Sequence, residues 1–170
     1  MNYILIGFKG TGKTTIAKIV SKKLKALFFD MDRIIEEEFS YNLNEKKSIK
    51  EIYQILQERE FRELESRSIK KLKNINNSII ASSGGFVLKN ENILVLKKNC
   101  KFIYLNTSKK EIEKRIDIEN AFLKTKENFE KEFLKRKSIY ENIADMQIDI
   151  NDENTPKDIA NKVIDKIYGK

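Results

Sequence analysis

Five short hydrophobic runs are distributed along the chain, and each is followed by a polar, acidic or glycine-rich stretch. The runs cover residues 2–7, 27–30, 78–81, 101–105 and 146–150. Brief apolar segments bounded in this way are typical of buried strands. The pattern therefore predicts five strands.

The intervals between these runs carry apolar residues at the spacing of one helical face. Helices are predicted around residues 34–39 and over 14–25, 48–74, 108–117, 129–140 and 156–167. Ser108 and Glu111 have the spacing of a capping box, and Thr155 can cap a last helix that starts at Pro156. Strands alternating with helices predict one α/β domain, residues 1–170, in which helices cover both faces of a parallel sheet.

Composition narrows the chemistry that this domain can perform. The 170 residues include 34 Lys+Arg, 26 Asp+Glu, one cysteine and no histidine, for a formal net charge of +8. The absence of histidine excludes a Ser-His-Asp triad and zinc sites built from Cys and His. Any catalysis must rely on Asp, Glu, Lys, Arg or a bound cofactor.

The positive charge does not by itself indicate a nucleic-acid partner, because lysines interleave with acidic residues in stretches such as 46–67. No apolar run approaches the roughly 18 to 20 residues of a membrane span. The first eight residues also lack the charged segment that opens a signal peptide. We therefore expect a cytoplasmic protein with no nucleic-acid or membrane partner.

Residues 7–14 read Gly-Phe-Lys-Gly-Thr-Gly-Lys-Thr, a complete match to the phosphate-binding motif G-x-x-x-x-G-K-[ST]. The motif lies between a predicted strand and a predicted helix, which is the context that it requires. Its backbone N–H groups attract phosphate, Lys13 reaches the β and γ oxygens, and the Thr14 hydroxyl can bind Mg²⁺. The sequence therefore predicts a nucleoside triphosphate site.

Two carboxylates, Asp30 and Asp32, stand at the end of the second predicted strand. One can hold a magnesium-bound water, and the other can align an acceptor hydroxyl for in-line attack. Both can equally well cap the helix that follows, since aspartate is common at helix starts. The two residues alone leave both roles open.

These features and several others resemble the shikimate kinase family over nearly the whole chain. The resemblance rests on motifs at residues 7–14, 30–36, 48–53, 58–65, 81–87 and 136–145. It implies a P-loop kinase fold with strand order 2-3-1-4-5, a substrate-binding helical region at about 31–62 and a mobile lid at about 117–128. It also implies transfer of a phosphoryl group from ATP to the 3-hydroxyl of shikimate, with Mg²⁺ as cofactor. By the same resemblance the protein would be a monomer.

The resemblance implies that Lys13 and Asp32 are catalytic, with Asp32 as orienting group or base at the acceptor hydroxyl. Thr14 would bind Mg²⁺ directly, and Asp30 would bind it through water. The nucleotide-binding residues in the loop would be Gly10, Thr11, Gly12, Lys13, Thr14 and Thr15.

On the acceptor side, the resemblance implies that Arg62 and Arg136 clamp the substrate carboxylate. A guanidinium fork matches a carboxylate better than the point charge of lysine does. Gly84 and Gly85 would line the pocket with backbone N–H groups. Either arginine, taken alone, also fits an ordinary surface ion pair.

Arg115 and Pro156 would enclose the adenine ring of the nucleotide, by stacking and cation–π contact. Pro156 also fits the simpler role of a residue that starts a helix, and the two roles are compatible.

Two positions depart from the family pattern. Ser83 stands where the family usually has the first of three glycines, and a required φ above zero would store strain there. Residues 120–123 read Asn-Ala-Phe-Leu where the family's lid has Arg-Pro-Leu-Leu, so Asn120 replaces an arginine that reaches the transferred phosphoryl group. Lys124 or Lys126 could supply a point charge but no fork. We therefore expect a slow kinase.

Three other functions fit parts of the pattern. A related small P-loop kinase would act on gluconate or a nucleoside monophosphate, and a degenerate member would bind nucleotide or substrate with little turnover. A basic nucleic-acid-dependent ATPase fits less well, because the chain lacks a second domain and aromatic residues grouped with Lys and Arg on one strand face.

Overall fold

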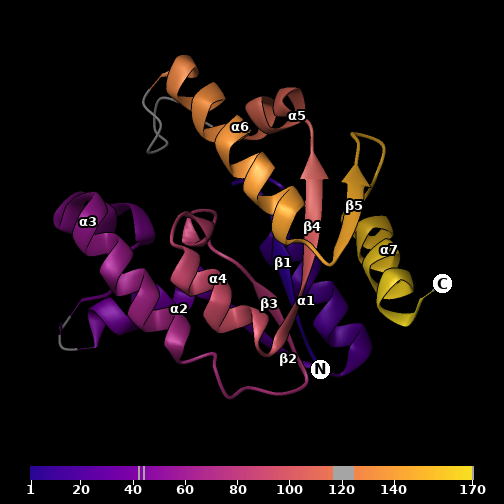
Figure 1. Cartoon of the computed structure of the whole chain (residues 1–170), viewed down its shortest axis with the longest axis horizontal. Helices are drawn as coiled ribbons and strands as arrows, with labels where there is room; N and C mark the ends of the chain where they lie inside the picture. Colours follow the sequence, from indigo (N-terminus) through magenta and orange to yellow (C-terminus); the bar gives the residue numbers. More distant parts are fainter. Residues whose placement is uncertain (42, 44, 117–124, 170) are drawn as a thin grey trace.

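Strands and helices alternate along the chain in the computed structural model, which describes residues 1–41, 43, 45–116 and 125–169 (Figure 1). The strands are β1 (Asn2–Ile6), β2 (Leu27–Asp30), β3 (Ser78–Ala81), β4 (Cys100–Thr107) and β5 (Met146–Ile150). The helices are α1 (Lys13–Leu24), α2 (Met31–Ser40), α3 (Ile49–Lys70), α4 (Asn90–Lys97), α5 (Lys109–Arg115), α6 (Lys126–Ile143) and α7 (Pro156–Tyr168), with a 3-10 turn η1 (Phe86–Leu88).

The five strands form one parallel sheet in the order β2-β3-β1-β4-β5. Both the five strands and this order confirm the predictions. β1 lies at the centre, so Leu5 is level with Ala81 of β3 on one side and with Ile103 of β4 on the other. Because parallel strands end at the same edge, the segments that follow β1, β2 and β3 converge there.

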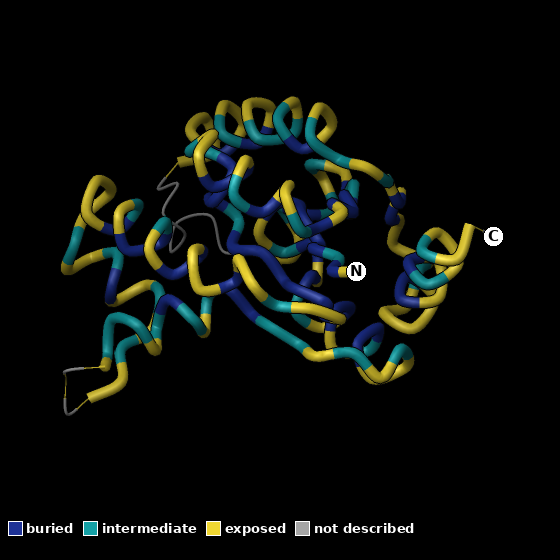
Figure 2. Tube along the Cα trace, turned by 60° about the horizontal axis from the view of Figure 1, so that its bottom comes forward, coloured by how far each residue is buried: buried dark blue, intermediate teal, exposed yellow. Residues whose placement is uncertain are grey.

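Alternate residues of the strands point to opposite faces of the sheet and form a hydrophobic layer on each face. Ile4 and Ile6 of β1 pack with side chains from α2, α3, α4 and α6, whereas Leu5 packs with side chains from α1 and α7. Buried segments accordingly lie inside a shell of helices whose outer sides are exposed (Figure 2). The helical layers on both faces confirm the predicted architecture.

Helices α2 and α3 pack against each other at one end of the sheet and share a small apolar cluster of their own, formed by Ile35, Ile52, Phe61 and Leu64. Ser48 caps α3 through a reciprocal pair of bonds with Glu51. The predicted helix over 48–74 differs from the structure in two respects, because α3 ends at Lys70 and is interrupted. Gln57 has φ 57° and ψ 178°, which breaks the helical path after its second turn.

Other element boundaries also differ from the predictions. Capping boxes at Ser108 and Thr155 are confirmed, and Pro156 occupies the first turn of α7. α4 was not predicted, because eight residues give little periodicity. α6 begins at Lys126, so the expected lid at 117–128 overlaps this helix, while its residues 117–124 lie outside the described part of the chain.

Within the described ranges, every helix is too short or too polar to cross a lipid bilayer.

Candidate active site

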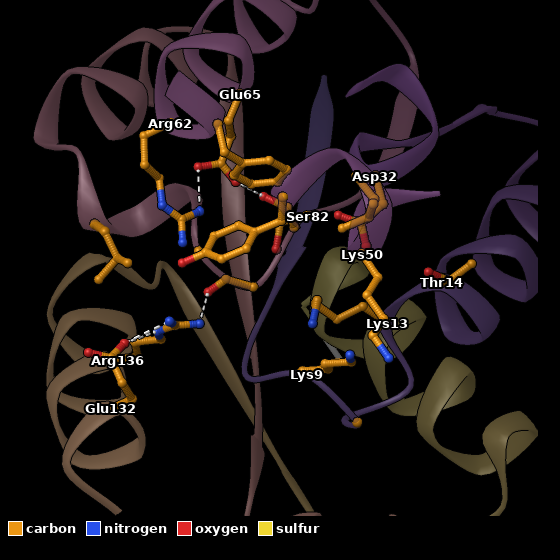
Figure 3. A pocket seen from close by; sticks show the side chains of 18 of the residues that line it. Lys9, Lys13, Thr14, Asp32, Lys50, Arg62, Glu65, Ser82, Glu132 and Arg136 are labelled. Atoms are coloured by element: carbon orange, nitrogen blue, oxygen red, sulfur yellow. Dashed lines mark hydrogen bonds and ion pairs between the residues drawn. The ribbon is translucent and has the colours of Figure 1, made fainter. Parts of the chain in front are cut away.

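A cavity of about 880 Å³ opens where the ends of β1, β2 and β3 meet α3 and α6. The phosphate-binding loop lines one side of it, and two arginines, Arg62 from α3 and Arg136 from α6, line the other (Figure 3). The cavity therefore combines a loop suited to phosphate with two guanidinium groups suited to a second anion.

The loop after β1 has glycine at positions where the backbone conformation would strain other residues. Gly7 has φ +149°, and a Cβ there would lie 3.0 Å from the carbonyl oxygen of Leu105. Gly12, with φ 84°, is the N-cap of α1. These conformations direct the chain around the helix N-terminus, where free N–H groups favour an anion. Gly10, Thr14 and Thr15 line the cavity, whereas Thr11 is buried and donates to the Phe8 carbonyl at 3.0 Å.

Lys13 lies at the first position of α1 with its side chain folded over this loop. Its Nζ donates to the carbonyl oxygens of Gly7 and Phe8, both at 2.9 Å. Burial lowers the pKa of Lys13 to about 8, although Asp32 and Asp30 oppose the change. When a phosphate is bound, the Lys13 ammonium would donate to its charged oxygens in place of these two neutral carbonyl oxygens.

Asp30 and Asp32 have different tasks. The Asp30 carboxylate accepts from the Thr14 hydroxyl at 2.8 Å and, as the N-cap of α2, from the backbone N–H of Asp32 at 3.0 Å. The capping role and the position beside Thr14 are thus both observed. Burial raises the pKa of Asp32 to about 6, with a further increase from Asp30, while Lys13 acts in the opposite direction. Asp32 lines the cavity near Lys13 (Figure 3).

Arg62 is held by two acidic residues of its own helix. Its Nη1 donates to Glu65 at 2.9 Å and its Nε to Glu58 at 3.3 Å. Burial alone would lower the pKa of Arg62, but Glu65 and Glu58 raise it. Gly85 packs closely against the guanidinium of Arg62. A Cβ at position 85 would lie only 2.8 Å from the Arg62 Cζ, so a side chain there would clash.

Arg136 is anchored on the opposite wall. It donates to Glu132 through Nη2 at 2.6 Å and Nε at 2.9 Å, and its Nη1 lies 3.3 Å from the carbonyl oxygen of Gly84. The same carbonyl accepts from the Tyr140 hydroxyl at 2.7 Å. The guanidinium lies 5.3 Å from the centre of the Phe8 ring, a cation–π contact that links α6 to the phosphate loop.

Of the two residues expected at the adenine ring, Arg115 lines this cavity and Pro156 does not. Arg115 lines it and lies 3.6 Å from Asp152 in the segment before α7. Pro156 is exposed at the start of α7 and is not among the residues that line the cavity.

Comparison with known proteins identifies this arrangement. The family model described as shikimate kinase matches residues 9–168, which include the phosphate loop from Lys9 onward, both aspartates and both arginines. The chain belongs to the shikimate kinase family. A shikimate kinase of Thermodesulfovibrio yellowstonii is 39% identical to it over 168 residues, covering 96% of this chain and 92% of the relative. One from Persephonella marina is 35% identical over 169 residues, covering 98% of each protein.

Solved shikimate kinases have the same fold. The structure of shikimate kinase from Acinetobacter baumannii in complex with shikimate superposes with a TM-score of 0.85 at 26% identity, covering 99% of this chain and 93% of that one. The fold and the family predicted from the motifs of this chain are therefore confirmed.

Ser83 does not store the strain considered for it, because positive φ is found at three other non-glycine residues of the described chain, Lys25, Gln57 and Asn77. Its hydroxyl instead donates to Glu65 at 2.6 Å. A residue that departs from the pattern of shikimate kinases is thus joined to the group that holds Arg62.

The acidic residues that hold the two arginines were not assigned roles from the sequence. Glu65 is fully buried, and Glu58 and Glu132 line the cavity. The three- and four-residue spacings Glu58–Arg62, Arg62–Glu65 and Glu132–Arg136 are a signal that could have found them, because such residues are neighbours on a helix. The three carboxylates accept the hydrogen bonds that hold the guanidinium groups of Arg62 and Arg136.

Proposed function

We propose that the protein transfers the γ-phosphoryl group of ATP to the 3-hydroxyl of shikimate, giving shikimate 3-phosphate and ADP. The observation that carries this proposal is that Arg62 and Arg136 face the phosphate loop across one cavity. The pair suits a carboxylate acceptor, and family membership makes shikimate that acceptor.

For the nucleotide, we assign the phosphates to the loop residues and the adenine to the region of Arg115 and Pro156. The loop residues are Gly10, Thr11, Gly12, Lys13, Thr14 and Thr15. Lys13 would leave the carbonyls of Gly7 and Phe8 and bind the β and γ oxygens, where it stabilises charge that develops on the transferred group.

For the acceptor, Arg62 and Arg136 would bind the carboxylate, Gly84 and Gly85 would line the ring, and Asp32 would bind the 3-hydroxyl. The hydroxyl oxygen attacks the γ-phosphorus, the bond from that phosphorus to the β–γ bridging oxygen breaks, and ADP leaves with the bond's electron pair. The hydroxyl proton goes to Asp32, whose pKa of about 6 suits a base near neutral pH.

The residues present fit Mg²⁺. Thr14 and Asp30 offer a hydroxyl and a carboxylate that already contact each other at 2.8 Å, and hard oxygen ligands are those that Mg²⁺ prefers. Among the described residues no group of three or more acidic, Cys or His side chains could hold an ion alone. This also fits Mg²⁺, which usually completes its shell with water and substrate phosphates and, when bound, neutralises phosphate charge.

The proposal is tested by coupled ADP release with MgATP, comparing shikimate with gluconate and AMP as acceptors. Lys13→Met serves as the control for contaminating kinases. Release that depends on shikimate supports the proposal. Release that depends on another acceptor replaces the substrate, and shikimate binding without release supports a degenerate binder. We also propose a cytoplasmic monomer, and light scattering that gives a dimer mass would contradict the oligomeric state.

A further inference from the structure

We propose that Ser83 is a positioning residue for Arg62, acting through the Glu65 carboxylate, and that these three side chains set the affinity of the cavity for an acceptor carboxylate. The identity of the acceptor as shikimate rests on the proposed function. The three residues come from two elements, since Arg62 and Glu65 lie on α3 and Ser83 lies in the loop after β3.

The geometry gives each oxygen of Glu65 one donor. Oε1 accepts from the Ser83 hydroxyl at 2.6 Å. Oε2 accepts from Arg62 Nη1 at 2.9 Å (Figure 3). The Glu65 side chain is 1% exposed, so water does not replace either donor. A buried carboxylate depends strongly on its donors, because an unmet charge in a protein interior is costly.

Glu65 controls Arg62 more strongly than Glu58 does. The bond to Glu58 is longer, at 3.3 Å, and the Glu58 side chain is 63% exposed. Exposed ion pairs contribute little, whereas a short bond to a buried charge contributes much more. The direction of the guanidinium therefore depends mainly on how Glu65 is held.

The Ser83 hydroxyl limits the pair of Arg62 and Glu65 to one hydrogen bond. With Oε1 occupied by serine, the guanidinium meets the carboxylate through Nη1 alone, so Nη2 is not used in this pair and Arg62 lines the cavity. Without the hydroxyl, Oε1 would lack its donor, and the guanidinium that already donates to Oε2 can supply a second N–H. A carboxylate and a guanidinium readily form two parallel bonds, and that arrangement would turn Nη2 away from the substrate.

We call the chain of contacts from Ser83 through Glu65 to Arg62 the relay. Steady-state kinetics, with the concentrations of shikimate and MgATP varied separately, test it. Ser83→Ala removes the hydroxyl but keeps the Cβ, whereas Ser83→Gly removes both and leaves more room for a water molecule. We expect Ser83→Ala to raise KM for shikimate roughly 5- to 10-fold with KM for ATP unchanged, and Ser83→Gly to lie between it and the wild type. An unchanged KM for shikimate, an equal rise in both KM values, or a larger effect in Ser83→Gly overturns the proposal.

Ser68→Ala is the matched control. Ser68 is another buried serine, on the same helix as Glu65, and its hydroxyl has no hydrogen-bond partner within the described residues. This variant also loses a buried hydroxyl, but it leaves the relay intact. We expect wild-type values of both KM constants.

A measurement on the free protein separates failure of the relay from failure of the proposed function. The chain has six arginines, so their Nε–H signals in a ¹⁵N NMR spectrum are few, and Arg62→Lys identifies the one from Arg62. We expect Ser83→Ala to move this signal and Ser68→Ala to leave it in place. An unmoved signal overturns the relay, even if shikimate turns out not to be the acceptor.

Discussion

At the scale of single residues, Asp32, the proposed base, has a pKa that burial raises to about 6. A base must be ionised to take the hydroxyl proton, so with a pKa of about 6 we expect kcat/KM for shikimate to fall as the pH drops below 6. Asp32→Asn should lower kcat at least about 100-fold and remove this pH dependence. Rates between pH 5 and 8 measure both effects. An acidic limb that persists in the variant would mean that another group titrates.

The same substitution should stabilise the free protein at neutral pH. The folded pKa of Asp32 lies above its ordinary value of 3.8, so its contribution to the free energy of unfolding is greatest below pH 3.8 and is lost as pH rises through about 6. Asn is neutral throughout, so we expect a gain of about 1–2 kcal/mol at pH 7 and little gain near pH 4. Urea unfolding at the two pH values measures it. Equal stability of both proteins at pH 7 would contradict the raised pKa.

The two cavity arginines should not be replaceable by lysine. Arg62→Lys and Arg136→Lys keep the charge but lose the fork, so each should raise KM for shikimate by roughly 10-fold or more with little change in KM for ATP. Arg59→Lys is the control, because Arg59 is an exposed residue of α3 that lies 3.9 Å from Glu60. If all three variants behave alike, the arginines do not bind the acceptor.

At the scale of elements, the break in α3 stores strain. Gln57 adopts φ 57° and ψ 178°, a region that strongly favours glycine. Gln57→Gly should therefore be neutral or stabilising, whereas Gln54→Gly, at an ordinary helical position one turn earlier, should cost about 1 kcal/mol. Thermal unfolding of the two variants gives the comparison. An equal loss in both would show that Gln57 is not strained.

We predict that the segment between α5 and α6 limits turnover, because the resemblance to the family aligns Asn120 with an arginine of the lid. Asn120→Arg should raise kcat, by about 10-fold or more if the new guanidinium reaches the transferred group, because such groups stabilise transition-state charge. Asn120→Lys is the control for charge without a fork. Unchanged kcat in both variants would remove the basis for expecting a slow enzyme.

Elements differed in how well the sequence predicted them. The five strands were found because each is a short apolar run ended by a glycine, an acidic residue or a turn, and β1 and the phosphate loop were located together. The break at Gln57 was missed because backbone strain depends on packing between α2 and α3, which no local pattern records. The spacing of Arg62 and Glu65 indicates that they are neighbours on a helix, but an acidic residue among many on a charged helix gives no sign that it is buried.

At the scale of the whole molecule, the cavity joins groups from the sheet edge, α3 and α6, so occupied sites should stabilise the entire fold. At 100 times the Kd, ADP or shikimate should each add about 2.7 kcal/mol, or roughly 5 to 10 °C in Tm. Differential scanning fluorimetry measures the shift. Lys13→Met should lose the shift with ADP and keep the shift with shikimate, and loss of both would indicate a damaged fold instead.

The groups proposed to bind phosphate and those proposed to bind the acceptor come from different segments of the chain, which affects how the protein could be altered to bind new acceptors. The phosphate-binding groups come from one continuous stretch, β1 to the start of α1, whereas the anion-binding groups come from α3, α6 and the loop after β3. Changes to the second set leave the first stretch of backbone intact. This scaffold can therefore be redesigned for other carboxylate-bearing alcohols by altering three separate segments, while the phosphoryl donor site is inherited unchanged.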